Sequence, residues 1–217
     1  MSSPSRSLAV LVLTTLTAAL CPPAAASPAT ETHLDFTVLK DGSPIGQHHI
    51  DLKRDGDTET VAIRTNVQVR VAFVVVYRFE HSGTELWRGG HLVTLHTQTN
   101  DDGNRHAVTV TAAADHLDIE ADGTRHQSAA GIIPASLWNQ DLVRQSTLLN
   151  TLTGAPMSVT VADLGTDTIA AHTSPTPAHH FKITGELERD LWYDPSGTLV
   201  QVEFKAQDGA DIRYVLG

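Results

Sequence analysis

Cysteine and basic residues are both scarce in this sequence. Cys21 is the one cysteine among 217 residues, so the chain can form no internal disulfide. Only 15 residues are Lys or Arg, against 25 Asp or Glu, which gives a formal net charge of -10 with His neutral. Nucleic acids and anionic membrane surfaces both attract clustered cations. We therefore expect no nucleic-acid partner and no charge-driven membrane binding, and stability must come from a buried apolar core.

No apolar run is long enough to cross a membrane as a helix. The longest candidate, residues 8–20, falls short of the roughly 20 residues that a bilayer requires. Arg6 precedes it and residues 24–26 are alanines, a pattern typical of a secretory signal peptide. We predict a signal peptide over residues 1–26, a single domain over residues 27–217, and a periplasmic or secreted location.

Two alternatives to a cleaved signal peptide remain. The first is a transmembrane anchor, which the short apolar run disfavours. The second is lipid attachment at Cys21, as in bacterial lipoproteins. Leu20 argues against lipid attachment, because such signals carry a small residue just before the cysteine.

Residues 58–100 organise the rest of the chain. Apolar side chains fall on alternate positions from 61 to 75, with polar residues such as Arg64 and Gln68 between them, which is the period of a β-strand. At about 3.3 Å per residue, an unbroken strand over residues 61–73 would be about 40 Å long, so a bend or bulge is expected. Residues 72–76 read AFVVV and are apolar on both faces, which predicts that another element covers them.

Short alternating segments separated by turn residues fill most of the remaining chain. Asp41 and Gly42 predict a tight hairpin between strands over residues 34–40 and 45–53. The sequence SPTP at residues 174–177 is expected to be a loop at a sheet edge, because proline has no backbone donor for a strand ladder. Further strands are expected over residues 92–100, 105–112, 116–121, 124–127, 157–164, 168–172, 181–187, 191–193, 199–205 and 212–216.

One segment has helical spacing. Its apolar residues, which include Trp138 and Leu142, recur on one side of a helix over about residues 134–153. Pro134 suits the first turn of that helix, and Gly154 would end it. A helix with one apolar stripe must lie against an apolar surface, and the AFVVV segment is a natural partner. The predicted fold is therefore mainly β: a large curved antiparallel sheet, as a half-barrel or open barrel, covered by one α-helix.

Several segments together carry a resemblance to a known family. They are the signal peptide, DGSPIG at residues 41–46, the hairpin over residues 77–87, the predicted Trp-bearing helix, and LWYDPSGTLVQVEF at residues 191–204. In this combination the chain resembles a family of exported bacterial proteins of unknown function, over nearly all of residues 27–217. More loosely, the arrangement is similar to the unclosed barrels of periplasmic lipoprotein carriers. That likeness would imply a concave, helix-covered apolar cavity for acyl chains.

No residue pattern indicates a particular reaction. The sequence has no G-x-S-x-G motif, and the predicted mature chain has no cysteine nucleophile. Glu80, His81 and Glu85 bracket a turn and could form an acid–base pair, but solvated turn residues are the simpler interpretation. Adjacent His81 and Ser82 point apart in a strand, which disfavours a catalytic triad. We predict no catalytic residues, and an enzyme is the third hypothesis.

Twelve histidines raise the question of a metal site. Two ligands on one strand face need an even separation. His91 and His96 are five positions apart and His48 and His49 are adjacent, so each pair splits across the two faces. Surface histidines are the favoured interpretation, and a site assembled from distant strands is the alternative. We expect no metal and no other cofactor.

Aromatic residues are few, at 5% of the chain, and several fall on the expected strands and helix. Such residues suit a pocket lining, although filling an ordinary core is the favoured alternative. The candidate ligand-binding residues are Phe73, Val75, Tyr77, Trp87, Trp138, Leu142 and Trp192.

Two functional hypotheses follow. The first is non-catalytic binding or transport of an apolar, lipid-like ligand in a cavity between the AFVVV segment and the helix, where each buried CH2 would contribute about 0.8 kcal/mol. The second is a cell-envelope interaction protein that docks a protein partner by strand addition at a sheet edge near residues 174–177.

Overall fold

The computed structural model describes residues 29–171 and 174–217. The signal peptide predicted over residues 1–26, with Cys21, lies outside the described residues. His172, at the end of the predicted strand over residues 168–172, also lies outside them.

Strands make up most of the described chain. The elements in chain order are β1 (Thr30–Lys40), β2 (Ser43–Asp55), β3 (Thr58–Val71), β4 (Val74–Arg88), β5 (His91–Asp101), β6 (Asn104–Ala112), β7 (His116–Ala121), β8 (Thr124–Ala129), β9 (Ile133–Pro134), the 3-10 helix η1 (Gln140–Arg144), β10 (Thr147–Leu149), β11 (Pro156–Ala171), β12 (Ser174–Gly185), β13 (Arg189–Tyr193), β14 (Leu199–Lys205) and β15 (Asp211–Leu216).

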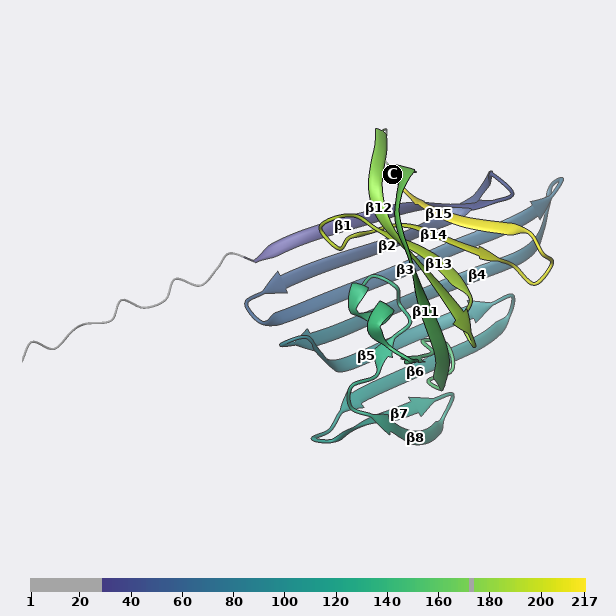
Figure 1. Ribbon diagram of the computed structural model, residues 1–217. Coiled ribbons are helices and arrows are strands. Elements are labelled where there is room, and N and C mark those ends of the chain that lie inside the picture. Colours follow the sequence, from purple (N-terminus) through teal and green to yellow (C-terminus); the bar gives the residue numbers. More distant parts are fainter. Residues whose placement is uncertain (1–28, 172–173) are drawn as a thin grey trace, which may run out of the picture.

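All of these strands belong to one sheet (Figure 1). Its order runs from β8 back through β1, and β1 then pairs with β15, from which the order runs back to β9. Neighbours are antiparallel except β9 and β10, which are parallel. Among the described residues the two end strands, β8 and β9, do not pair with each other, so the sheet stays open. The prediction of a mainly β chain with a large open antiparallel sheet is confirmed.

Tight Asp-Gly turns connect several strands of the first half. Asp41 and Gly42, between β1 and β2, have φ values of 48° and 80°. Two consecutive positive φ values are typical of a type I′ turn, whose twist matches that of a β-hairpin, and Asp-Gly adopts it readily. Asp-Gly turns with the same signs of φ join β5 to β6 and β7 to β8. The hairpin predicted at Asp41 and Gly42 is therefore confirmed.

The sheet curls so that its two halves pack against each other. In Figure 1, strands β11 and β12 run across the face of the earlier strands at a steep angle. Side chains from both halves, such as Phe36 on β1 and Leu191 on β13, form one apolar core. The segment between β9 and β11 is bonded to both halves, because Thr97 on β5 donates to the backbone oxygen of Thr151 at 2.6 Å and Tyr193 on β13 donates to that of Leu137 at 2.7 Å.

The α-helix predicted over residues 134–153 is wrong. That segment contains the end of β9, the short helix η1 and the strand β10. Leu148 and Leu149 are both fully buried, and a helix with a single apolar stripe does not bury two adjacent residues equally. Oδ1 of Asn150 accepts hydrogen bonds from the backbone N–H groups of Leu152 and Thr153, which replace helical ones. The segment fills the inside of the curled sheet as an irregular plug.

The AFVVV segment forms the exposed end of a hairpin, and the prediction that another element covers it is wrong. β3 ends at Val71 and β4 begins at Val74, so the expected long strand is two strands. Phe73 is 99% exposed, Val74 65% and Val76 50%. These side chains face solvent, so they enclose no cavity with residues 134–153. The turn has no glycine or asparagine; Ala72 takes the positive φ, +54°, which hydrophobic periodicity does not reveal.

β11 and β12 form a long ribbon in the second half of the sheet. The segments predicted as strands over residues 157–164 and 168–172 belong to the single bulged strand β11. Pro175 and Pro177 lie in β12 and pair with β11, so SPTP is part of a strand and not the predicted loop, whereas its predicted place at a sheet edge is correct. β12 pairs with β13 only from His179 onward. The prolines therefore have a strand partner on one side, as their missing backbone donor requires.

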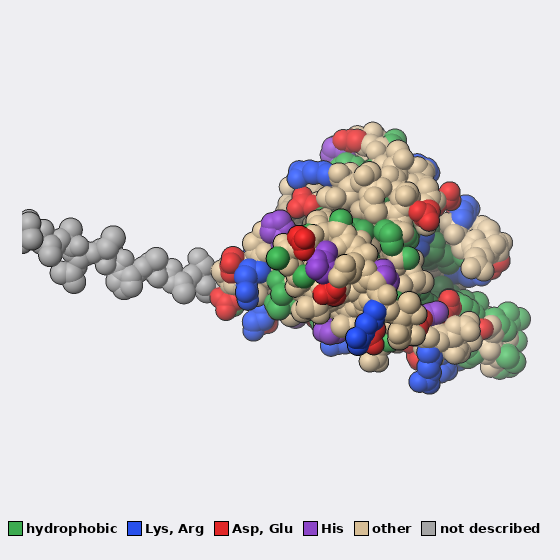
Figure 2. Space-filling model, turned by 90° about the horizontal axis from the view of Figure 1, so that it is seen from below, with side chains coloured by type: hydrophobic (Ala, Val, Ile, Leu, Met, Phe, Trp, Pro, Cys, Tyr) green, Lys and Arg blue, Asp and Glu red, His purple; other side chains and the backbone are tan. Residues whose placement is uncertain are grey.

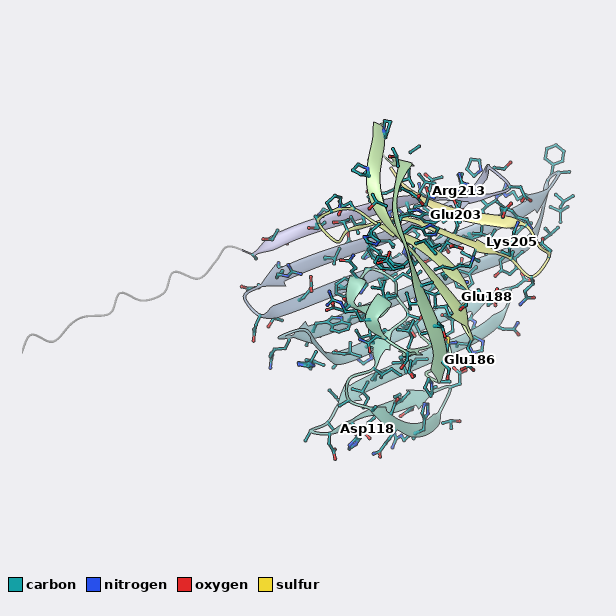
Figure 3. All side chains as sticks on the ribbon, viewed as in Figure 1. Asp118, Glu186, Glu188, Glu203, Lys205 and Arg213 are labelled. Carbon is teal, nitrogen blue, oxygen red and sulfur yellow. The ribbon has the colours of Figure 1, made fainter. Side chains whose placement is uncertain are left out.

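Charged residues cover the outer face of β14 and β15 (Figure 3). Nε of Arg213 on β15 forms an ion pair with Oε1 of Glu203 on β14 at 2.6 Å. Lys205 forms a second ion pair with Asp211. Val202, next to Glu203 on β14, is 1% exposed and faces the core. The first four residues of β14 are all buried, so only the end of this strand, from Glu203 onward, has a partly solvated face.

Candidate functional site

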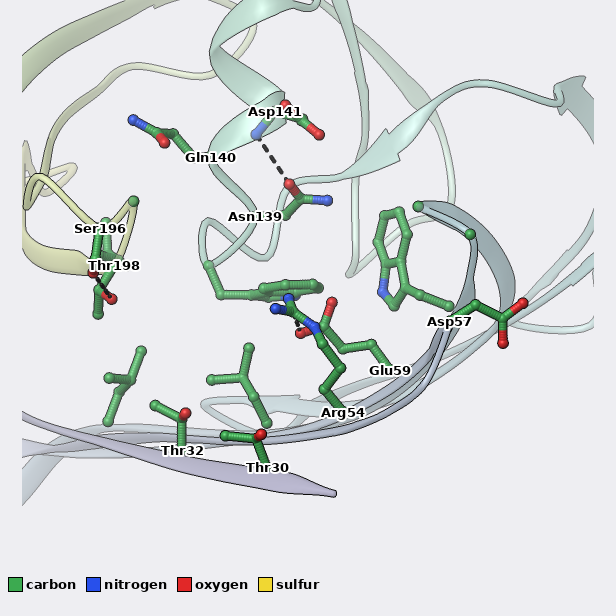
Figure 4. A pocket seen from close by; sticks show the side chains of 18 of the residues that line it. Thr30, Thr32, Arg54, Asp57, Glu59, Asn139, Gln140, Asp141, Ser196 and Thr198 are labelled. Atoms are coloured by element: carbon green, nitrogen blue, oxygen red, sulfur yellow. Dashed lines mark hydrogen bonds and ion pairs between the residues drawn. The ribbon is translucent and has the colours of Figure 1, made fainter. Parts of the chain in front are cut away.

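A pocket of about 640 Å³ opens at one end of the curled sheet (Figure 4). Its walls come from the start of β1, the β2–β3 and β4–β5 turns, the start of η1, and the loop between β13 and β14. Alternate turns of an antiparallel meander lie at the same end of the sheet. Residues that are remote in sequence therefore meet around this pocket.

Two tryptophans contribute to the floor of the pocket. Trp87 on β4 and Trp138 just before η1 meet edge to face, with ring centroids 5.6 Å apart and ring planes at 88°. Leu34, Leu52 and Leu199 add apolar surface. Trp87 is only 3% exposed and Trp138 9%, so both rings are held in the core and offer a narrow apolar surface. Such a surface suits the flat or apolar part of a small ligand.

The buried carboxyl group of Glu85 holds both rings in place. Oε2 of Glu85 accepts a hydrogen bond from Nε1 of Trp87 at 2.8 Å and one from Nε1 of Trp138 at 2.9 Å. Glu85 lies two positions before Trp87 on β4, so both side chains point inward. Glu85 is 1% exposed and does not line the pocket. It positions the floor and does not itself reach a ligand.

Burial favours the neutral form of this carboxyl group. Burial raises the pKa of Glu85, while the hydroxyl of Ser136 and the two indole N–H groups act to lower that pKa and the charge of Glu59 acts to raise it. Oε1 of Glu85 and Oγ of Ser136 are both buried and have no partner with hydrogen-bond geometry among the described residues. A proton on Oε1 would make that atom a donor, with the Ser136 hydroxyl as an available acceptor.

The rim of the pocket is polar and carries both signs of charge. Nη2 of Arg54 on β2 lies 2.8 Å from Oε1 of Glu59 on β3. The Arg54 side chain is 65% exposed and that of Glu59 16%, so the guanidinium is the solvated partner. Asp57 and Asp141 add negative charge, and Oδ1 of Asn139 accepts from the backbone N–H of Asp141 at 2.9 Å, which caps η1. The rim can hydrogen-bond both cationic and anionic groups of a ligand.

The structure brings part of the predicted ligand-binding set together. Trp87 and Trp138 line the pocket, and Leu142 packs in the same core cluster, fully buried. Phe73 and Val75 lie at the β3–β4 hairpin end and do not line the pocket. Their predicted role in a covered cavity is therefore wrong.

The other two predicted residues lie elsewhere. Tyr77 is near the base of the β3–β4 hairpin end, where its hydroxyl donates to Oδ1 of Asp101 at 2.8 Å. Trp192 stacks on His180, with ring centroids 4.1 Å apart, and donates its indole N–H to Oδ2 of Asp167 at 3.1 Å. Neither residue lines the pocket.

The acid–base pair considered for Glu80, His81 and Glu85 does not form. His81 is half-buried, its Nδ1 lies 2.8 Å from Oγ1 of Thr99, and its partial burial lowers the pKa of His81 to about 4. Glu80 accepts from Nδ2 of Asn100 at 3.1 Å. Glu85 is engaged by the tryptophans. The three residues thus have separate partners within the described chain.

His48 is an interior residue, contrary to the surface assignment. His48 is 8% exposed, its Nδ1 lies 2.7 Å from Oγ1 of Thr65, and burial lowers the pKa of His48 to about 3. His81 is half-buried. Others, such as His33, lie on the surface beside aspartates. Within residues 29–171 and 174–217, no group of three or more His, Cys, Asp or Glu side chains is arranged to hold a metal ion.

Sequence reasoning missed the polar rim. Arg54, Glu59 and residues 139–141 are ordinary polar residues near turns, and no local motif distinguishes them. The order of the turns in the sequence could have predicted part of this rim. The turns at residues 56–57 and 89–90 are separated by β3, one hairpin turn and β4. That spacing puts both turns at one end of the sheet.

A family match covers most of the chain. Residues 36–217 match the family described as domain of unknown function DUF6134. The chain belongs to this family. The predicted resemblance to a family of unknown function is thereby confirmed. A comparison with curated proteins finds no match.

A solved structure shares the fold. It is the crystal structure of a beta-barrel-like protein of the domain of unknown function DUF1849 from Brucella abortus, with a TM-score of 0.61 and 10% sequence identity. The match covers 88% of this chain and 95% of that chain. At this identity the likeness supports the fold alone. Among the described residues of the DUF6134 chain, no helix is long and apolar enough to cross a membrane.

Proposed function

We propose that this DUF6134 protein is an exported, non-catalytic binding protein that takes a small amphipathic, lipid-like molecule in the pocket at the end of the curled sheet. Export rests on the signal pattern of residues 1–26. Ligand binding rests chiefly on one observation: a pocket of about 640 Å³ whose aromatic floor is held by a buried carboxyl group.

The size and lining of the pocket support a small ligand. Ligand pockets commonly have volumes of about 300–1,000 Å³ and combine apolar walls with a few placed polar groups. Trp87, Trp138 and Leu52 supply the apolar part, and Arg54 supplies a solvated cation at the rim. The apolar part of the ligand would lie on the floor, and an anionic or hydroxylated part would meet the rim.

The packed interior limits how much of a ligand can be apolar. Leu142, Leu148 and Tyr193 are fully buried inside the curled sheet, and they belong to the same apolar core as the pocket floor. A long acyl chain would have to displace such side chains, at a cost comparable to disrupting a packed core. A short apolar or ring-shaped moiety fits the pocket without that cost.

The test fills the pocket with a side chain. Thr32→Trp places an indole into the pocket, and His33→Trp is the matched control, because adjacent positions of β1 point to opposite faces. The probe is 8-anilinonaphthalene-1-sulfonate, an amphipathic anion whose emission rises in apolar sites. We expect Thr32→Trp to weaken probe binding at least about tenfold and His33→Trp to leave it within about twofold. Native mass spectrometry of the purified protein would show any co-purified ligand.

Two results would contradict the proposal. One is equal probe binding by the wild type and the two variants. The other is a bare polypeptide in native mass spectrometry combined with no probe binding by the wild type.

A second candidate is docking of a protein partner at the edge of β11. β11 pairs with β10 over residues 156–158, and from Thr160 onward its one strand partner among the described residues is β12. The open edge has backbone groups that an added strand could pair with. A photo-crosslinker at Thr168 should capture a partner in cells that the same crosslinker at Thr109, on the doubly paired strand β6, does not. Capture at neither position would count against this candidate.

A further inference from the structure

Exposed hydrophobic side chains gather at the end of the β3–β4 hairpin. Six large hydrophobic residues are well exposed in the described chain, and one of them, Leu164, lies on β11. Figure 2 shows hydrophobic side chains gathered on the projection at the right of the molecule, on the side where this hairpin ends in Figure 1. We call residues 71–76 the apolar tip. Its exposed large residues are Val71, Phe73, Val74, Val75 and Val76.

The apolar tip projects beyond the neighbouring strands. The last β2–β3 pair joins Gly46 to Val67, and the last β4–β5 pair joins Phe79 to Asp101. Residues 68–77 therefore form ladder pairs only within the hairpin, in the part of the chain that the structure describes. No strand among residues 29–171 and 174–217 pairs with either side of the tip.

Both faces of the hairpin end are apolar, as is its apex. Val74, Val75 and Val76 are consecutive, so their side chains occupy both faces of the strand, and Phe73 at the turn is 99% exposed. A patch for a flat partner surface needs to be apolar on one face only. A tip that is apolar all round is fully covered by a medium that surrounds it, such as the apolar part of a lipid bilayer.

The dimensions of the apolar tip fit shallow insertion. Three residues separate the apex from the level of Val76, a length of about 10 Å at about 3.3 Å per residue. Interfacial segments enter a bilayer to about 5–10 Å. The hairpin edges carry unpaired backbone groups that hydrocarbon cannot satisfy, which opposes deeper entry.

The residues behind the tip suit the headgroup region. Arg70 and Arg78 flank the tip, no acidic residue lies between positions 68 and 78, and Tyr77 is amphipathic. Asp101 and Asp102 lie further back, bonded to Tyr77 and to the backbone of Arg78. The chain carries a net charge of -10, so its attraction to a bilayer must come from apolar contact and not from charge. A bilayer of lipids without net charge avoids repulsion and is therefore the partner that we consider.

We propose that the apolar tip enters the surface of a lipid bilayer, with Phe73 deepest and the two arginines at the level of the phosphates. This contact is separate from the ligand pocket, because none of the tip residues lines the pocket.

The experiment is flotation of the protein, as processed by the expressing cell, with phosphatidylcholine vesicles. Phe73→Ser removes the most exposed apolar group, and Leu164→Ser is the matched control, since it removes an exposed large hydrophobic residue outside the tip. The wild type and both variants have the same N-terminus, so any contribution of the N-terminus to flotation is equal in all three proteins. We expect Phe73→Ser to lower the partition coefficient at least about tenfold and Leu164→Ser to leave it within about twofold. Thermal unfolding of both variants checks that each is folded.

Three outcomes would overturn the proposal. The wild type fails to float with the vesicles, or Phe73→Ser floats as well as the wild type, or Leu164→Ser weakens flotation as much as Phe73→Ser. If the unbound wild type is a dimer and Phe73→Ser a monomer, the tip is an interface between two copies. If Trp87→Ala, at the pocket floor, leaves flotation unchanged while abolishing probe binding, the membrane contact and the proposed ligand function are independent.

Discussion

Trp138 donates its indole N–H to Oε2 of Glu85 across 2.9 Å, although the two residues lie 53 positions apart in the chain. The bond ties the irregular segment between β9 and β11 to the C-terminal part of β4. It also fixes one ring of the pocket floor. A neutral carboxyl group can accept this bond without the free-energy cost of burying a net charge.

Substituting Glu85 tests its protonation state. Glu85→Gln keeps an oxygen acceptor for both indoles and a neutral group, so we expect the free energy of unfolding at pH 7 to change by less than about 1 kcal/mol. Glu85→Ala leaves two buried N–H donors without an acceptor, each worth about 1–3 kcal/mol, and adds a cavity. We expect Glu85→Ala to lose at least about 3 kcal/mol in urea unfolding.

The pH dependence of the same variants gives a second measurement. Because the pKa of Glu85 is raised in the folded state, the carboxyl group contributes stability below its ordinary unfolded pKa, and that contribution is lost as the pH rises through the folded pKa. Glu85→Gln should abolish this loss of stability with rising pH. A Glu85→Gln variant that is strongly destabilised at pH 7 would indicate an ionised carboxylate in the native protein.

His48 and His81 should make the protein sensitive to acid. The pKa of His48 is lowered to about 3 and that of His81 to about 4, both chiefly by burial, while an unfolded histidine titrates near 6.5. Below pH 6.5 the unfolded chain takes up protons that the folded chain does not, so stability falls as the pH drops. Each histidine should contribute a slope of about 1.4 kcal/mol per pH unit between pH 6.5 and its folded pKa.

Urea unfolding at a series of pH values measures this slope. Asn can place a polar atom near the position of histidine Nδ1 without titrating. His48→Asn and His81→Asn should therefore each lower the slope of stability against pH by about 1.4 kcal/mol per pH unit, the equivalent of one proton. His33→Asn is the surface control. Hydrogen bonding to Asp51 raises the pKa of His33, so its contribution has the opposite sign and is lost as the pH rises. Parallel pH curves for the wild type and His48→Asn would refute the prediction.

The period-2 alternation of residues 58–71 was sufficient to predict strands, because core-facing and solvent-facing side chains alternate along β3. The Asp-Gly turns were equally predictable from the sequence, because few residue types adopt the positive φ values that these turns require. The turn at Ala72 does not follow this preference for Asp and Gly at positive φ. With a positive φ at a non-glycine residue, the hairpin turn was hidden inside an apolar run, and an exposed tip looked like a covered strand.

The plug and the pocket were less predictable for a different reason. Trp138 and Leu142 do face the core, as expected, but the core surrounds the plug on more than one side, so a helical stripe was the wrong inference. The pocket rim depends on which turns meet when the sheet curls. Arg54 and Asp141 line the same pocket because the sheet curls, and no local sequence pattern around either residue indicates this arrangement.

Leu142 should anchor the plug. It is the buried residue of η1, and truncation to alanine removes a fully buried side chain. Leu142→Ala should lower the free energy of unfolding by about 2–5 kcal/mol. Arg144→Ala, in the same short helix, removes an exposed ion pair with Asp141 and should cost less than about 1 kcal/mol. Equal losses in urea unfolding would mean that η1 is not docked through Leu142.

Gly154 tests the contact between the end of the plug and β7. Its φ is +68°, and an added Cβ would lie 2.8 Å from Cγ2 of Ile119 and 3.3 Å from Cγ1 of Val108. Gly123→Ala is the matched control, because Gly123 has a φ of +81° and no atom within 4 Å of the added Cβ. Both variants incur backbone strain of about 1–2 kcal/mol, but Gly154→Ala should lose a further 1–3 kcal/mol or so from overpacking. If thermal unfolding shows the two variants to be equally stable, the plug does not pack against β6 and β7 as described, because backbone strain alone would then account for both losses.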